Sequence, residues 1–307
     1  MNTLVSPPFP YAGEVAALAT ALAWTATAVF GDIAVRRVGS LAVNLLRLVS
    51  ASLAFSLYGA IARGWPLPLD ASAHNWLWLV LSGLVGFMVC DLCLFKAFGY
   101  IGARLSMLLM SLAPPIAAVA ALLIGQEMSL AGWIGMFVTL AGVTWVAMER
   151  RPAGVEADST HRLRGVVLCV VAAVGQGTGV VMTRYGMDTY DPFAATQIRV
   201  LTGMVGFAVL VVASGWCGKV VEALRDRKAM MLIVANSLLG TFAGVTLQLI
   251  SMKYIPAGVT STLCSIVPVT IIPLAVLIQK ERVSPRAIFG ACVAVAGIAI
   301  LMWPKGP

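Results

Sequence analysis

The chain has 307 residues, of which 60% are hydrophobic and only 11% are charged, with a mean hydropathy of +0.94. Soluble globular domains carry about 25% charged residues, so this composition excludes a water-soluble globule and predicts an integral membrane protein. The net charge of +8 comes from basic residues at the ends of apolar segments, which is typical of topology signals and argues against nucleic-acid binding. Of the six cysteines only Cys217 lies clearly in a loop, so no disulfide framework is predicted.

Apolar segments of roughly 20 residues follow one another along the chain, and each is long enough to cross a bilayer as a helix. Residues 1–10 hold three prolines and should form a flexible arm, and the apolar run that begins at Tyr11 is too long for a cleavable signal. We expect an all-α protein with ten transmembrane helices. The expected spans lie at about residues 12–35, 42–62, 76–98, 102–124, 130–148, 165–186, 193–214, 229–252, 256–278 and 286–303.

The second half of the chain repeats the first. Pro114 corresponds to Pro268 and Glu127 to Glu281, a shift of 154 residues in both cases. A fixed-period match of this kind indicates repeated structural units. Other matches at nearly the same shift are Gly86 with Gly240, Ser111 with Ser265, Gly142 with Gly297, and Arg47 with Arg199. The repeat predicts a first five-helix unit at 11–148, a linker at 149–164, a second five-helix unit at 165–303 and a tail at 304–307.

An odd number of spans in each unit has a topological consequence. The second unit must enter the membrane from the opposite face, so we expect two inverted repeats related by a pseudo-two-fold axis in the membrane plane. Secondary transporters are built in this way, with the ligand site near the middle of the membrane between the halves.

A set of residues in the first unit also resembles a known family, the EamA-type family of the drug/metabolite transporter superfamily. The residues that carry the resemblance are Trp24, Arg47, Ala113-Pro114-Pro115, Glu127, Gly135 and Gly142. The resemblance covers nearly the whole chain, because the second unit repeats the Arg, Pro, Glu and Gly features. It implies ten spans, a cavity between the halves, and export of amino acids or other small metabolites across the cell membrane.

Three functions remain open at this point. The first is export of small organic metabolites such as amino acids by alternating access, in the cell (inner) membrane. The second is export of drugs or quaternary cations, and the third is an enzyme acting on lipid-linked substrates. We expect no enzyme, because no set of catalytic groups is visible, and we expect no cofactor and no metal. The partners that we expect are a small-molecule substrate and membrane lipid, with the protein as a monomer.

Asp91 is the first candidate for a site residue. It is the only carboxylate predicted far from both ends of a span, and acids within the membrane usually mark substrate or ion pathways. Phe95, four residues on, lies on the same helix face. The pair could hold a substrate ammonium or take part in proton coupling, or Asp91 could be a packing residue that hydrogen bonds to a neighbouring helix.

Trp24 and Gln176 occupy equivalent positions in the middle of the first and sixth spans, and Gln248 lies on the eighth. An aromatic ring and amide groups at mid-membrane suit ligand contact, although helix packing explains them as well. Arg47 and Arg199 lie one or two turns inside their spans, so they can extend toward the membrane surface. We expect these two arginines to have a structural role, such as capping helices of the other half.

The remaining candidates are structural or gating residues of the two hairpins. Glu127 and Glu281 should accept backbone N–H bonds at the start of the following helix. Pro114 and Pro268 should kink their spans, and serine hydroxyls can satisfy the carbonyls that a kink releases. These serines are Ser111 and Ser265.

The side on which the termini lie is predicted in two ways that disagree. Apart from Arg47 and Arg199, 15 Lys and Arg residues lie in or next to the connections after the odd-numbered spans, and 4 lie in or next to the segments on the other side. The positive-inside rule then puts both termini outside the cell, whereas the family resemblance implies termini inside. Both arguments put the termini on the same side.

Overall fold

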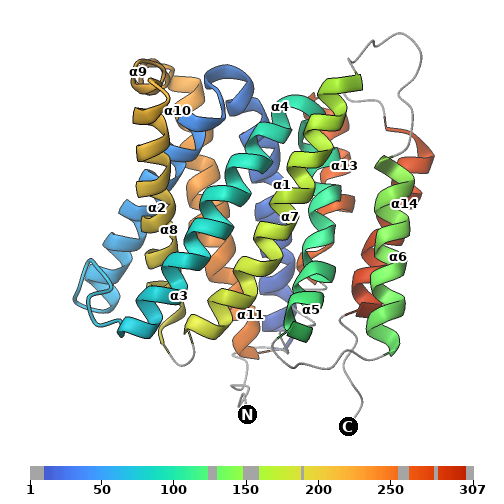
Figure 1. Cartoon of the computed structure of the whole chain (residues 1–307), viewed down its shortest axis with the longest axis horizontal. Helices are drawn as coiled ribbons and strands as arrows, with labels where there is room; N and C mark the ends of the chain where they lie inside the picture. The colour runs from blue at the N-terminus through green and yellow to red at the C-terminus, as the bar shows by residue number, and fades with distance from the viewer. Residues whose placement is uncertain are drawn as a thin grey trace.

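In the computed structural model, which describes residues 10–123, 130–147, 159–187, 190–254, 263–279 and 283–301, every regular element is a helix (Figure 1). Six helical runs among these residues are long and apolar enough to cross a membrane, and shorter apolar helices accompany them. The prediction of an all-helical membrane protein is therefore confirmed. The number of ten spans and the rotation that relates the two halves stay predictions.

The first half contains two connections that depend on glycine. The helix α1 passes into α2 through Gly39 alone, whose φ of 83° lies in the left-handed region. Gly102, with a φ of 77°, breaks the helical path inside α4, at the place where the sequence predicts a new span. The elements of this half are α1 (Ala12–Val38), α2 (Ser40–Ala62), α3 (Ala73–Gly83), η1 (Leu84–Val89), α4 (Cys90–Leu109), η2 (Met110–Leu112), α5 (Ala113–Leu123) and α6 (Leu130–Ala147).

The second half contains a short helix that was not predicted, α9, in the connection between two spans. Asp226 follows it and starts the next helix, because its side chain accepts hydrogen bonds from the backbone N–H groups of Lys228 and Ala229. The elements are α7 (Ser159–Met187), α8 (Pro192–Ala213), α9 (Cys217–Arg225), α10 (Arg227–Asn236), η3 (Ser237–Gly244), α11 (Val245–Tyr254), α13 (Val267–Gln279) and α14 (Pro285–Leu301).

Two of the elements are π-helical, and they occupy matching places in the repeat. The segment η1 connects α3 to α4, and η3 connects α10 to α11. Gly86 of η1 and Gly240 of η3 are the pair that the sequence aligns at a shift of 154 residues. A π-helical turn inserts a residue into an α-helix, is rare, and is frequent at functional sites.

The helices pack with polar side chains inside and apolar side chains outside. Asn44, Gln197 and Asn236 are buried, while large aliphatic residues such as Leu57 and Val212 are exposed on the outer surface of the helices. A water-soluble protein distributes its residues in the opposite way. This pattern suits a bundle that is surrounded by lipid.

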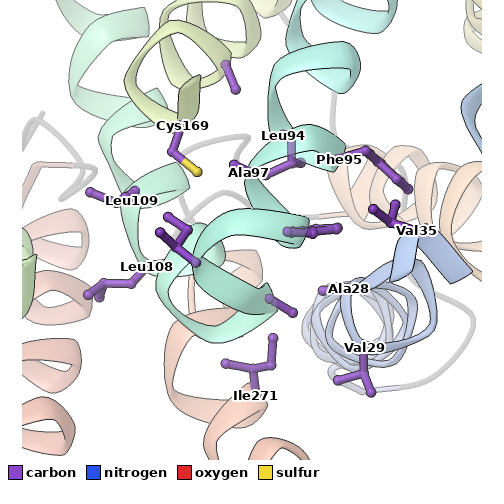
Figure 2. Packing of buried hydrophobic residues seen from close by; sticks show 14 of the residues in the cluster. Ala28, Val29, Val35, Leu94, Phe95, Ala97, Leu108, Leu109, Cys169 and Ile271 are labelled. Carbon is purple, nitrogen blue, oxygen red and sulfur yellow. The ribbon is translucent and has the colours of Figure 1, made fainter. Parts of the chain in front are cut away.

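The largest buried cluster joins helices of both halves. Figure 2 shows Ala28 and Val29 of α1, Leu108 of α4 and Ile271 of α13 within this cluster. At another contact between the halves, α6 packs on α14, where a Cβ added to Gly142 would lie 2.5 Å from the backbone N of Ala294. The glycine is required there because the two helix backbones approach closely.

Separate polar contacts tie helix ends together at the two ends of the bundle. At one end Arg37, which closes α1, forms an ion pair of 2.8 Å with Asp226, which precedes α10. The backbone N–H of Ala229 and the Arg37 guanidinium hold the pKa of the Asp226 carboxyl below its usual value, so the carboxyl stays ionised. At the other end Arg63, after α2, forms an ion pair of 3.2 Å with Asp191, before α8. The helices α2 and α8 therefore run antiparallel.

Candidate substrate site

Arg47 and Asp91 form a buried ion pair at the contact between the two halves. Arg47 on α2 donates through Nη2 to Oδ2 of Asp91 on α4, and the two side chains are only 8% and 13% exposed. Nη1 of Arg47 donates to Oγ1 of Thr241 in η3, at 3.1 Å. The guanidinium also lies 4.9 Å from the centre of the Phe95 ring, within the range of a cation–π interaction. The pair thus connects two helices of the first half with the π-helical segment of the second.

Neighbouring amide and hydroxyl groups fix the position of this pair. Asn44, one helical turn before Arg47, accepts a hydrogen bond from Arg47 Nη2 at 3.4 Å and donates to the backbone carbonyl of Asp91 at 3.3 Å. Ser237 of η3 donates to the backbone carbonyl of Arg47 at 2.8 Å. Because charges in a low-dielectric interior are costly unless they are paired and hydrogen bonded, these contacts explain how the pair is tolerated at this depth.

Arg199 carries the second guanidinium of the site and is not paired in the same way. It lies on α8, with its guanidinium 4.9 Å from the centre of the Phe87 ring. A Cβ added to Gly86 would lie 3.0 Å from Nη2 of Arg199, so the glycine leaves room for this group. Arg199 interacts electrostatically with Asp91, but the described residues offer its guanidinium no hydrogen bond, and its buried Nε has no partner. The cluster of two guanidinium groups and one carboxylate therefore has an excess positive charge.

The two arginines have equivalent surroundings in the two halves. Each is the eighth residue of its helix, since α2 begins at Ser40 and α8 at Pro192. Arg47 contacts η3 of the second half, and Arg199 contacts η1 of the first half. The equivalence ends at the carboxylate, because the repeat aligns Asp91 with Val245. One half of the site can therefore form an ion pair and the other cannot.

Asp91 is positioned by the π-helical segment that precedes it. The segment η1 ends at Val89, and Asp91 is the second residue of α4. Because the π-helical turns change the angular register of the residues that follow, they set the direction in which this side chain points. The sequence had suggested Asp91 as an isolated acid, and the structure pairs it with an arginine from a different span.

Trp24, Gln176 and Gln248 are less directly connected to the pair. The indole Nε1 of Trp24 donates to the backbone carbonyl of Gly240 in η3, at 3.3 Å. The amide Oε1 of Gln176 on α7 lies 3.8 Å from Sγ of Cys90, the residue before Asp91. Gln248 is half-buried on α11. The first two thus lie next to the π-helical segments, where packing and ligand contact are both consistent with their positions.

The hairpin residues show one difference from expectation. Pro114 lies at the start of α5, directly after the 3₁₀ segment η2 that contains the buried Ser111. Pro114 and Pro268, both of which we expected to kink a span, are each the second residue of a helix, α5 and α13. Proline is tolerated there because the first N–H groups of a helix have no partner within it. Ser265 lies in the turn before α13, and Glu127 and Glu281 lie outside the described residues.

Sequence reasoning missed two features of the site. We expected Arg47 to extend toward the membrane surface, but it points to Asp91 and Thr241 within the bundle, because an acid lies there to pair with it. Thr241 and Phe87 were not singled out at all. Their signal was present in the alignment of the repeats, since each stands one residue after a matched glycine, Gly86 or Gly240.

A helical bundle with apolar outer surfaces and a buried charged site between two similar halves defines a membrane transporter as the class of protein. The EamA-like transporter family model matches this chain twice, at residues 11–148 and 163–303. The chain therefore belongs to the EamA-like transporter family.

Two individual proteins are similar to this chain over nearly its whole length. One is the "Uncharacterized transporter YetK" of Bacillus subtilis (strain 168), which is 23% identical over 298 residues, or 95% of this chain and 88% of YetK. The other is a solved structure described as "Crystal structure of protein", which matches with a TM-score of 0.63 and 17% identity. The match covers 94% of this chain and 95% of the chain in the solved structure. At 17% identity the match shows a similar fold and nothing about function.

Proposed function

We propose that this protein is a secondary transporter that exports small organic metabolites, such as amino acids, across the cell (inner) membrane by alternating access. The observation that carries the proposal is the charged cluster of Arg47, Asp91 and Arg199 within an apolar bundle. Charged groups are expensive in a membrane, so they are retained where they contact a substrate or an ion. The cluster lies where α2 and α4 of one half meet α8 and η3 of the other.

The reciprocal contacts of the two halves support an inverted repeat of ten spans. Each arginine reaches the π-helical segment of the opposite half, and α6 of one half packs on α14 of the other. A site shared in this way changes shape when one half rocks against the other. Alternating access by rigid-body rocking around a central site is the mechanism that such symmetry favours.

The charges of the cluster suit a zwitterionic substrate. The carboxylate of an amino acid would pair with Arg199, whose planar guanidinium has the geometry for two parallel hydrogen bonds. The ammonium group would compete with Arg47 for Asp91, and the aromatic rings of Phe87 and Phe95 would flank the bound molecule. Binding would then release Arg47, whose Nη1 donates to Thr241 of the second half, and a change in this contact between the halves gives the substrate a way to favour the rocking motion.

The charge balance argues against the alternative of a quaternary-cation exporter. A quaternary cation, unlike a zwitterion, brings no carboxylate to pair with Arg199, so it would have to displace Arg47 from Asp91 and leave two guanidinium charges unbalanced. Asp91 is already paired with Arg47, and the additional charge of Arg199 would repel a cation. The same carboxyl could still serve proton coupling in the return step, when the substrate has left.

Transport in proteoliposomes tests the proposal. Purified protein should accelerate the exchange of a radiolabelled amino acid between the lumen and an external pool of the same compound. Equal rates in protein-free liposomes for every amino acid, together with active transport of a quaternary cation, would contradict the proposed substrate class.

A further inference from the structure

A hollow of about 750 Å³ lies away from the charged cluster, at the end of the bundle where α1 passes into α2. Its walls come from both halves of the chain, since residues of α4 and of the start of α7 complete it. The helices α4 and α7 touch just beside it, where a Cβ added to Gly165 would lie 2.6 Å from Cγ2 of Ile101. The hollow is therefore a recess at a contact between the two halves.

The walls of the hollow combine basic and hydroxyl groups with an exposed apolar surface. Lys96 and Arg164 bring two positive charges, and Ser40 and Tyr100 bring hydroxyl groups. Neither Lys96 nor Arg164 forms an ion pair or a hydrogen bond with the residues that the structure describes, and both are exposed. Leu163 and Val167 of α7 add apolar surface, with 63% and 53% of their area exposed.

This combination fits one kind of molecule. A phosphate accepts charge-assisted hydrogen bonds from lysine and arginine, and basic pockets between transmembrane helices near the membrane surface bind anionic lipid headgroups. A free phosphate would use the cations but leave the apolar wall exposed. A phospholipid would use both, because its acyl chains would cover Leu163 and Val167 while its headgroup sits between the cations.

We propose that this hollow binds an anionic phospholipid, with the headgroup phosphate between Lys96 and Arg164 and the acyl chains along α7. The bound lipid bridges α4 of the first half and α7 of the second. It therefore stabilises the arrangement of the halves that this structure records. Lipid binding in this hollow does not depend on the proposed substrate, because Arg47, Asp91 and Arg199 do not line the hollow.

Native mass spectrometry of the purified protein with added lipid tests the inference. The wild type should bind phosphatidylglycerol at least about fivefold more tightly than phosphatidylcholine, because one basic residue beside an anionic headgroup already contributes about 1 kcal/mol, a factor of about five. The double variant Lys96→Gln, Arg164→Gln should lose this preference. A matched control is Arg225→Gln, Lys228→Gln, which removes two exposed cations from α9 and α10 at the same end of the bundle and should keep it.

Two results would overturn the inference. One is an unchanged preference for phosphatidylglycerol in the Lys96, Arg164 variant, which would mean that the lipid binds elsewhere on the surface. The other is displacement of the lipid by millimolar inorganic phosphate, which would assign the hollow to a free anion. If the double variant does not fold, the single variants Lys96→Gln and Arg164→Gln carry the test, and each should weaken the preference partly.

Discussion

An Asp91→Asn variant should transport substrate more slowly than the wild type by about tenfold or more, which corresponds to a rate-limiting barrier at least about 1.4 kcal/mol higher. The substitution keeps the size of the side chain but removes the charge that holds Arg47 and that would receive a substrate ammonium. Initial rates of exchange in proteoliposomes measure the effect. The dependence of transport on pH should also become flatter, because a titrating group has been removed from the site.

A double variant separates the structural contribution of Asp91 from its function. Asp91→Asn alone leaves Arg47 buried without a counter-charge, which should lower the stability by about 3 kcal/mol. In the variant Arg47→Gln, Asp91→Asn both charges are gone, so the unfolding temperature should recover while transport stays low. If the double variant recovers transport together with stability, Asp91 acts only as a packing residue. Unchanged transport by the single variant between pH 5.5 and 8.5 would lead to the same conclusion.

Arg199→Gln should have the opposite effect on stability and an equally large effect on transport. The Nε of Arg199 is buried without a hydrogen-bonding partner among the described residues, which costs folding free energy. Glutamine removes that cost, and the variant should unfold at a higher temperature in detergent. Transport should fall by about tenfold or more, because the substrate carboxylate loses its partner.

An Arg199→Lys variant is the matched control for this prediction. It keeps the positive charge but loses the planar fork of the guanidinium, so it should recover only part of the transport. Arg199 is a structural residue if Arg199→Gln lowers the unfolding temperature and leaves transport at the wild-type rate. Stabilisation together with loss of transport is the signature of a residue that is retained for function at the expense of stability.

Much of the fold could be predicted because composition and repetition act on the whole chain. Runs of apolar residues predict helices in a membrane, and the matches of Pro114 with Pro268 and of Arg47 with Arg199 predict two similar units. The family model also matches the chain twice, at residues 11–148 and 163–303. The helix α9 was missed because it is only nine residues long and lies in a connection, where no membrane-length pattern marks it.

The pairing within the site could not be predicted from the sequence. Arg47 and Asp91 lie on different helices, 44 residues apart, and no local spacing rule connects them. Their contact depends on the π-helical turns of η1, which change the direction of Asp91, and such turns have no pattern of side chains that identifies them in a sequence. The sequence does identify the charged residues that lie within the spans. Unpaired charges are costly inside a membrane, so these residues are expected to have partners.

Ligand-induced thermal stabilisation of the purified protein tests the proposed substrate site most directly. The panel should contain amino acids, the corresponding amino-acid amides, which lack the carboxylate, and quaternary ammonium cations. We expect at least one amino acid to raise the unfolding temperature of the wild type, its amide to have little effect, and Arg199→Gln to lose the response. Stabilisation of the wild type and of Arg199→Gln by the same quaternary cation, with no response to any carboxylate, would contradict a site built around Arg199 and Asp91 for zwitterionic metabolites.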